Sequence, residues 1–134
     1  MAVYSSGPEE TLRAIADAYA NKDAEALLGY FADDARIIGS LRHEDWARKE
    51  DWAEYLRREL DDFEQLEYGL AEKDTEGLQS VARTDAVEVV TQTVGLRGSF
   101  RGRSFAHEGR WTCALRNDGG EWKVIFSQFS ISPI

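Results

Sequence analysis

The fold of this chain is decided by its last third, above all by residues 110–130, RWTCALRNDGGEWKVIFSQFS. Two runs rich in apolar residues flank the turn sequence Asn117-Asp118-Gly119-Gly120, a pattern that predicts a long β-hairpin. Successive side chains of a strand point to opposite faces. The polar residues that recur at every second position, and are therefore expected on one common face, are Arg110, Thr112, Gln128 and Ser130.

These four polar residues are candidates for lining a binding pocket. A buried polar side chain needs a hydrogen-bond partner, which the protein or a ligand can supply. Burying an arginine without a counter-charge is costly. An inward Arg110 therefore implies a carboxylate from a ligand or from the protein, and Glu108 has the same strand parity. The alternative interpretation is a structural network or an exposed face.

Upstream of the hairpin, helices come first and strands follow. Apolar residues at helical spacing predict three helices, one from Ser6-Gly7 to Tyr19, a short one capped by Asp23, and one within residues 43–63. Strands are expected over residues 35–39, 65–72, 78–83, 86–94, 105–116 and 121–131, with a turn over 95–102. Helices that precede an antiparallel sheet predict an α+β fold with the helices on one face.

The composition bounds the class of protein. A chain of 134 residues with four Trp, six Phe and five Tyr is expected to form a single domain, residues 1–134. The net charge of −9 argues against a nucleic-acid partner. The single cysteine, Cys113, fits a reducing compartment. Since neither a signal peptide nor an apolar run of about 20 residues is present, a cytoplasmic location without membrane insertion is expected.

Two further segments resemble the NTF2-like superfamily, in particular its SnoaL-like and kinase-association-domain-like branches. Residues 19–23, YANKD, and residues 30–35, YFADDA, are similar to the superfamily's passage from its helices into the first strand. Residues 122–130 are similar to its last strand. The resemblance covers nearly the whole chain. It implies a cone-shaped α+β fold, with three N-terminal helices packed on a curved, mixed-edge antiparallel sheet that encloses a pocket.

The resemblance allows the superfamily's catalytic positions to be checked one by one. The SnoaL-like branch often has a histidine where this chain has Gln128, which cannot act as a general base. Arg83 and Asp85 have the spacing of a pair used by limonene-epoxide-hydrolase-like members, but they lie at an expected turn. Positions that correspond to the tyrosine and two aspartates of ketosteroid-isomerase-like members hold Ile15, Gly39 and Thr112. The usual acid–base residues are therefore not retained, and no catalytic residue is assigned.

Large aromatic residues complete the set of pocket candidates, because in this fold some of them line the pocket mouth. The candidates of this kind are Tyr19, Trp46 and Trp52. The lone histidines His43 and His107 lack the i, i+4 spacing of a helical metal pair, so no metal site and no cofactor are expected.

Alternate residues of the last strand suggest a second copy of the chain as partner. Ile125, Phe129 and Ile131, with Lys123 and Ser127, give this strand an apolar odd face. A face of this kind that the chain's own helices do not cover requires another partner. A homodimer through the outer sheet face is therefore expected, and the resemblance implies the same.

Two functions are compatible with these patterns. The first is a small-molecule pocket protein that binds a small, partly apolar ligand and, if it is an enzyme, isomerises, cyclises or hydrolyses it. That function requires a deep, mostly apolar cavity with a few polar groups. The second is a non-catalytic homodimeric association module, with a filled cavity and a large apolar interface.

Overall fold

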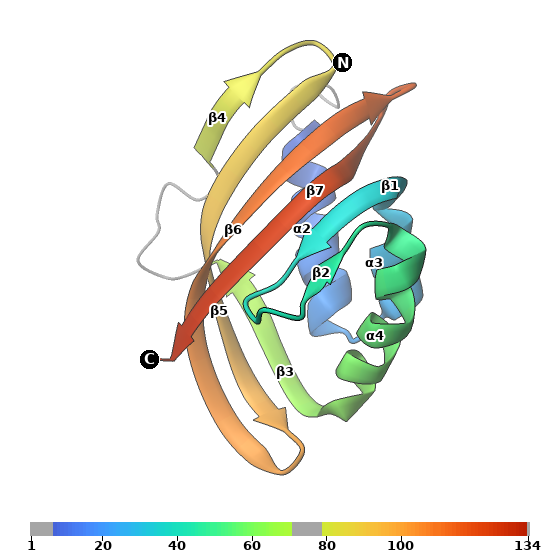
Figure 1. The fold of residues 1–134 in the computed structure, drawn as a ribbon. Coiled ribbons are helices and arrows are strands. Elements are labelled where there is room, and N and C mark those ends of the chain that lie inside the picture. Colours follow the sequence, from blue (N-terminus) through green and yellow to red (C-terminus); the bar gives the residue numbers. More distant parts are fainter. Residues whose placement is uncertain (1–6, 71–78, 134) are drawn as a thin grey trace.

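The computed structural model describes residues 7–70 and 79–133 (Figure 1). Three helices dominate the first half of the chain: α2 (Gly7–Ala20), α3 (Ala24–Gly29) and α4 (Lys49–Asp62). The strands β1 (Phe31–Ile38) and β2 (Asp45–Trp46) lie between α3 and α4. The remaining strands follow in chain order: β3 (Phe63–Leu70), β4 (Gln79–Arg83), β5 (Val87–Phe100), β6 (Arg103–Asp118) and β7 (Glu121–Pro133). The expected α+β fold and the long terminal hairpin are confirmed.

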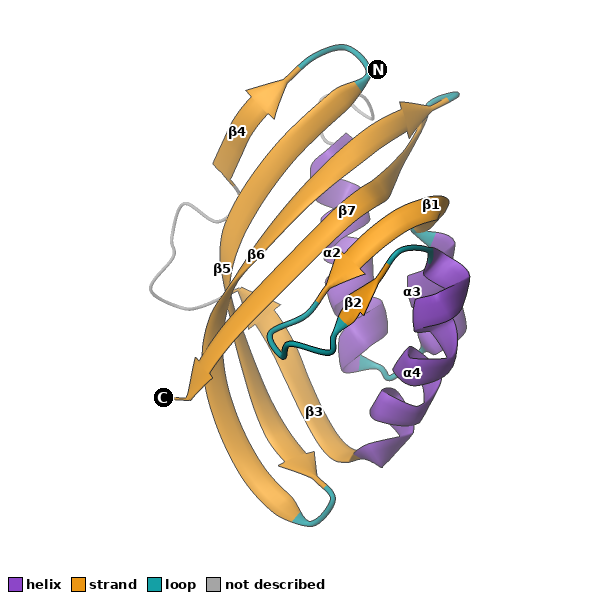
Figure 2. Cartoon of the chain, viewed as in Figure 1, coloured by secondary structure: helices purple, strands orange, loops and turns teal. Residues whose placement is uncertain are grey.

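The strands form one strongly curved sheet, and the helices lie on its concave side (Figure 2). The order across the sheet is β2-β1-β7-β6-β5-β3, and β4 also pairs with β5. All neighbouring pairs are antiparallel except β1 and β7, which are parallel. The sheet is therefore mixed near one edge, as the resemblance implied. None of the helices in the described part of the chain has the length and hydrophobicity needed to span a bilayer.

Several element boundaries differ from those expected. The first strand starts at Phe31 rather than Ala35, and the short strand β2 was not expected at all. The turn expected over residues 95–102 shrinks to Arg101 and Gly102, which both adopt positive φ, because β5 continues to Phe100. Parts of the strands expected over 65–72 and 78–83, and the helix cap expected at Ser6, lie outside the described residues.

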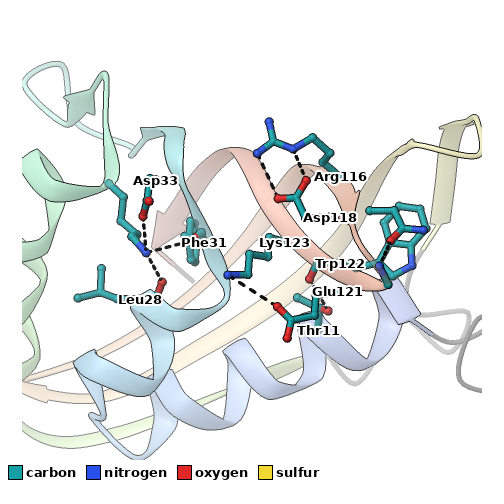
Figure 3. A network of polar contacts seen from close by, with 12 residues as sticks. Thr11, Leu28, Phe31, Asp33, Arg116, Asp118, Glu121, Trp122 and Lys123 are labelled. Atoms are coloured by element: carbon teal, nitrogen blue, oxygen red, sulfur yellow. Dashed lines mark hydrogen bonds and ion pairs between the residues drawn. The ribbon is translucent and has the colours of Figure 1, made fainter.

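The helices are fixed to the sheet by apolar packing and by a few specific polar contacts. Leu12 and Ile15 of α2 and Leu56 of α4 are buried in the common core. Asp23 caps α3 by accepting a hydrogen bond from the amide of Ala26 at 3.1 Å, as the sequence predicted. The ammonium group of Lys49, at the start of α4, binds the carbonyls of Leu28 and Phe31 and the carboxylate of Asp33 (Figure 3). The hydroxyl of Thr11 donates to the Trp122 carbonyl at 2.9 Å.

A β-bulge in β7 determines which side chains of the hairpin face the helices. Ala114 pairs with Phe126 but Leu115 pairs with Val124, so Ile125 is an extra residue on β7. Before the bulge, Trp122 and Val124 point inward and are buried. After the bulge the inward positions have odd numbers, and Ser127 is buried. The indole N–H of Trp111 on β6 donates to the Ser127 hydroxyl at 2.8 Å, which fixes this register.

The bulge corrects two expectations drawn from strand parity. The four polar residues do share one face, since Arg110 pairs with Ser130 and Thr112 with Gln128. That face is the outer one, however, and only Thr112 among the four is partly buried. The odd-numbered residues Ser127, Phe129 and Ile131, expected on an outer apolar face, line the interior instead. A single extra residue reverses the direction of every later side chain on a strand.

We predict that two serines of β7 differ sharply in their importance for stability. Ser127→Ala leaves the buried Trp111 N–H without an acceptor, so the free energy of unfolding should fall by about 1–3 kcal/mol. Ser130→Ala, on the exposed outer face, should change it by less than about 0.5 kcal/mol. Urea unfolding followed by tryptophan fluorescence measures both. Equal effects of the two substitutions would contradict the assigned register.

Candidate ligand-binding cavity

A cavity of about 1260 Å³ lies between the concave face of the sheet and the helices. Ile15 and Tyr19 of α2 and Trp52, Tyr55, Leu56 and Glu59 of α4 form its helical side. The sheet side carries inward residues of β3, β5, β6 and β7, and the segment between β1 and β2 closes one end. The sheet curves around the helices (Figure 1). The side chains between them leave the cavity unfilled.

Many aromatic rings line the cavity, and most of them contact a neighbouring ring. Trp46 of β2 contacts Tyr55 with ring centroids 4.7 Å apart, and Phe31 at the start of β1 contacts Trp52 at 4.8 Å. At the centre, Tyr68 lies between Tyr19 at 4.9 Å and Phe129 at 6.3 Å. At the far end, Phe63 contacts Phe100 and Phe105, and Phe105 stacks on His107. Such contacts hold the rings in fixed orientations.

Glu59 of α4 is an acidic residue on the helical side of the cavity. Its carboxylate accepts a hydrogen bond from the Tyr19 hydroxyl at 2.9 Å, which ties α4 to α2. Burial raises the pKa of Glu59 above its usual range, the hydroxyls of Tyr19 and Tyr55 oppose this, and the negative charge of Glu44 adds to it. The same burial raises the pKa of Tyr19, and the nearby Glu59 charge adds to that shift.

Glu44 brings a second carboxylate to the same end of the cavity. The Tyr55 hydroxyl donates to one carboxylate oxygen at 2.8 Å, and the amide of Leu41 donates to the other at 2.8 Å. The Gly39 amide also donates to the Glu44 carbonyl, and a Cβ at Gly39 would lie 2.8 Å from the Glu44 side chain. Burial raises the pKa of Tyr55, and its hydrogen bond to Glu44 adds to the shift. Glu44 and Glu59 thus lie on either side of the Tyr55 hydroxyl.

Further polar groups line the cavity. His107 lines the sheet side, and its Nδ1 atom is buried with no hydrogen-bond partner among the described residues. Arg58, Arg101 and Arg103 also line the cavity, and all three are exposed. Arg101 is paired with Asp62 at 2.7 Å. Within residues 7–70 and 79–133, no group of three His, Cys, Asp or Glu side chains is placed to hold a metal ion.

The structure divides the candidate site residues of the sequence into two sets. Tyr19, Trp46 and Trp52 line the cavity. Arg110, Thr112, Gln128 and Ser130 do not line it. Arg110 and Thr112 of β6 alternate with the buried Trp111 and Cys113 and so face outward, and the bulge turns Gln128 and Ser130 of β7 to the same outer face. The guanidinium of Arg110 reaches the Thr91 hydroxyl at 3.5 Å and remains exposed, so it needs no buried carboxylate.

Glu44, Tyr68 and Glu59 are among the polar cavity residues that sequence reasoning did not select. For Glu59 a signal was present: it lies four residues after Tyr55 and seven after Trp52, on the apolar stripe of its helix. A glutamate in such a stripe is exceptional because ionised carboxylates are seldom buried. Glu44 left no comparable signal, because it lies in an irregular segment whose path follows from Gly39 and Leu41.

A curved sheet with three helices on its concave side and a cavity between them defines an α+β fold. A profile of the SnoaL-like domain matches residues 9–134, and the chain belongs to this family of the NTF2-like superfamily. No curated protein sequence matches the chain.

Solved structures of the same fold are numerous, at low sequence identity. A proposed aromatic ring hydroxylase from Novosphingobium aromaticivorans superimposes with a TM-score of 0.83 at 16% identity, covering 96% of this chain and 91% of the other. A ketosteroid isomerase-like protein from Erwinia carotovora superimposes with a TM-score of 0.79 at 16% identity, covering 96% of each chain. A proposed calcium/calmodulin-dependent protein kinase II association domain from Xanthomonas campestris superimposes with a TM-score of 0.74 at 15% identity, covering 91% of this chain and 83% of the other. At these identities, the likeness shows the fold alone.

We predict that two conservative substitutions shift the pKa of Glu59 in opposite directions. Tyr19→Phe removes a hydrogen bond that favours the carboxylate, so the pKa of Glu59 should rise further. Glu44→Gln removes a neighbouring negative charge, so the pKa should fall. Titration of ¹³C-labelled glutamate carboxyl groups by NMR measures both shifts. If neither substitution moves the Glu59 resonance, the two carboxylates and two tyrosines do not form one cluster.

Proposed function

We propose that this protein binds a small, partly apolar organic molecule in the cavity between its sheet and helices. The single observation that carries the proposal is the cavity of about 1260 Å³ itself, with aromatic walls and a few polar groups inside. Ligand sites of proteins have this character. Space left unfilled in a core lowers stability, so a chain that served only as a scaffold would be more stable with the space filled by its own side chains.

The family supports this proposal. A SnoaL-like domain is a fold used for ligand binding and isomerase-type chemistry, and one structural neighbour is itself described as ketosteroid isomerase-like. Isomerisation, cyclisation or hydrolysis of the ligand stays a prediction, as does the loss of the family's usual acid–base residues. The single-domain organisation and the cytoplasmic location also stay predictions.

We also propose that the chain forms a homodimer through the outer sheet face. The residues that support this differ from those named from the sequence. Val89, Ala114 and Phe126 lie side by side across three strands, next to a row formed by Thr91, Thr112 and Gln128. Except for the exposed Gln128, these residues are only partly covered, and the helices lie on the opposite side of the sheet. Apolar and uncharged groups in adjacent rows suit a self-complementary interface.

The second candidate function is a non-catalytic association module that uses this same face. The observation that favours it is the likeness to a proposed kinase association domain. The two candidates differ in what they require of the cavity, since only the first needs it to be open to a ligand.

We predict that the uncharged dye N-phenyl-1-naphthylamine binds inside the cavity and gains fluorescence there. Ile131→Trp adds bulk to a cavity-lining position and should weaken dye binding at least about tenfold, because overfilled sites expel ligands or distort. Val81→Trp, at a position 64% exposed on β4, is the matched control and should leave binding unchanged. Absence of dye binding by the unaltered protein would favour the association module.

We predict that the unaltered chain sediments as a dimer and that Phe126→Asp yields a monomer. A carboxylate at the centre of the outer face would be buried without a partner in the dimer. Analytical ultracentrifugation gives the mass of both proteins, and dye binding shows whether the variant is still folded. A monomeric unaltered protein at micromolar concentration would contradict the proposed interface.

A further inference from the structure

We propose that the ligand of the cavity carries a positive charge, as an organic ammonium group held between aromatic rings and the carboxylates of Glu44 and Glu59. This inference rests on the proposed function and names the chemical class of its ligand. The residues concerned are Tyr19, Glu44, Trp46, Tyr55 and Glu59, here called the acidic–aromatic corner.

The first argument is the charge of this corner. Tyrosine hydroxyls and one backbone amide are the only groups that the described structure shows donating to the two carboxylates. Among the described residues, neither carboxylate forms an ion pair with a lysine or arginine. Carboxylates removed from water are ordinarily paired with a cation or protonated. Burial raises the pKa of Glu59, and the hydrogen bonds from Tyr19 and Tyr55 only partly oppose this shift. A cationic ligand would provide the compensating charge.

The second argument is the aromatic wall beside these carboxylates. The rings of Trp46 and Tyr55 contact each other at 4.7 Å, and the Tyr55 hydroxyl binds Glu44. The Tyr19 hydroxyl likewise donates a hydrogen bond to Glu59. A cation within about 6 Å of such a ring is attracted by its negative face, and tryptophan is the strongest of the ring types. Carboxylates surrounded by electron-rich rings favour ammonium groups over neutral groups of the same size.

The third argument concerns ligands of the opposite charge. An anionic ligand would have to approach Glu44 and Glu59, both of which line the cavity. The three arginines of the lining are exposed to solvent, and Arg101 is already paired with Asp62. The net charge of −9 on the whole chain also attracts cations and repels anions at a distance. Both the two carboxylates in the cavity and the net charge of the chain therefore disfavour an anionic ligand.

A bound cation should lower the pKa of Glu59, because a nearby positive charge stabilises the ionised carboxylate. By linkage, cation binding should strengthen as the pH rises through the pKa of free Glu59. The ionisable groups that act on Glu59 are Tyr19 of α2, Glu44 of the segment before β2 and Tyr55 of α4 itself. The other ionisable groups that line the cavity are Arg58, Asp61, Asp62, Tyr68, Arg101, Arg103 and His107.

Three probes that share a phenyl ring and a two-carbon linker test the inference: trimethyl(2-phenylethyl)ammonium, 2-phenylethanol and 3-phenylpropanoate. Each is added to the protein that carries bound N-phenyl-1-naphthylamine, and displacement gives its affinity. The ammonium probe should bind at least about tenfold more tightly than the alcohol, and the carboxylate should bind most weakly. The quaternary nitrogen carries no proton, so any pH dependence of its binding belongs to the protein.

Three variants locate the origin of the preference. Glu59→Gln and Glu44→Gln each remove one charge from the corner and should reduce the preference for the cation over the alcohol at least about threefold. Glu54→Gln removes the same charge from an exposed position of the same helix and should leave the preference intact. Folding of each variant is checked by its retained affinity for the uncharged dye.

The outcomes separate this inference from the proposed function. Dye binding together with equal affinities for the three probes overturns the cation inference and leaves the ligand-binding function standing. A loss of preference in Glu54→Gln as large as in Glu59→Gln also overturns it, because the effect would then follow net charge rather than the corner. Failure of the dye itself to bind contradicts the proposed function.

Discussion

The extra residue Ile125 in β7 is the constraint on which the rest of the structure depends. It turns Ser127 inward, where the Trp111 indole N–H binds it, and turns Gln128 outward. Phe129 and Ile131 of β7 then line the cavity on the concave face, and Gln128 and Ser130 lie on the convex face. Without the bulge the same strand would bring Gln128 and Ser130 into the interior. The direction of every β7 side chain after Ile125 therefore follows from one backbone irregularity.

The cavity combines two features that lower the stability of a folded chain. Its volume is not filled by side chains, and carboxylates lie within it without cationic partners among the described residues. Replacing either feature with apolar side chains would raise stability. Natural proteins keep such destabilising features where function requires them. The proposed ligand offsets both disadvantages at once, because it fills the space and brings the missing charge.

The sequence was sufficient for the arrangement of elements and insufficient for the direction of key side chains. Local patterns predict these elements: alternation predicts the hairpin, helical spacing predicts the helices, and capping chemistry predicts the cap at Asp23. The bulge leaves no such pattern, since Val124, Ile125 and Phe126 are all apolar and any of them could have been the extra residue. The sequence analysis selected Tyr19, Trp46 and Trp52 as pocket candidates, and all three line the cavity. Glu59 and Tyr19 lie 40 residues apart on different helices, so their hydrogen bond could be identified only from the tertiary structure.

The central claim is that the cavity is a binding site whose acidic–aromatic corner holds a positive charge. A crystal structure of the protein grown with trimethyl(2-phenylethyl)ammonium tests it most directly. The account predicts density for the probe inside the cavity, with its nitrogen within about 6 Å of the Trp46 or Tyr55 ring and beside the carboxylate of Glu59. A cavity filled by the protein's own side chains, or a probe bound with its nitrogen directed away from both carboxylates, would contradict it.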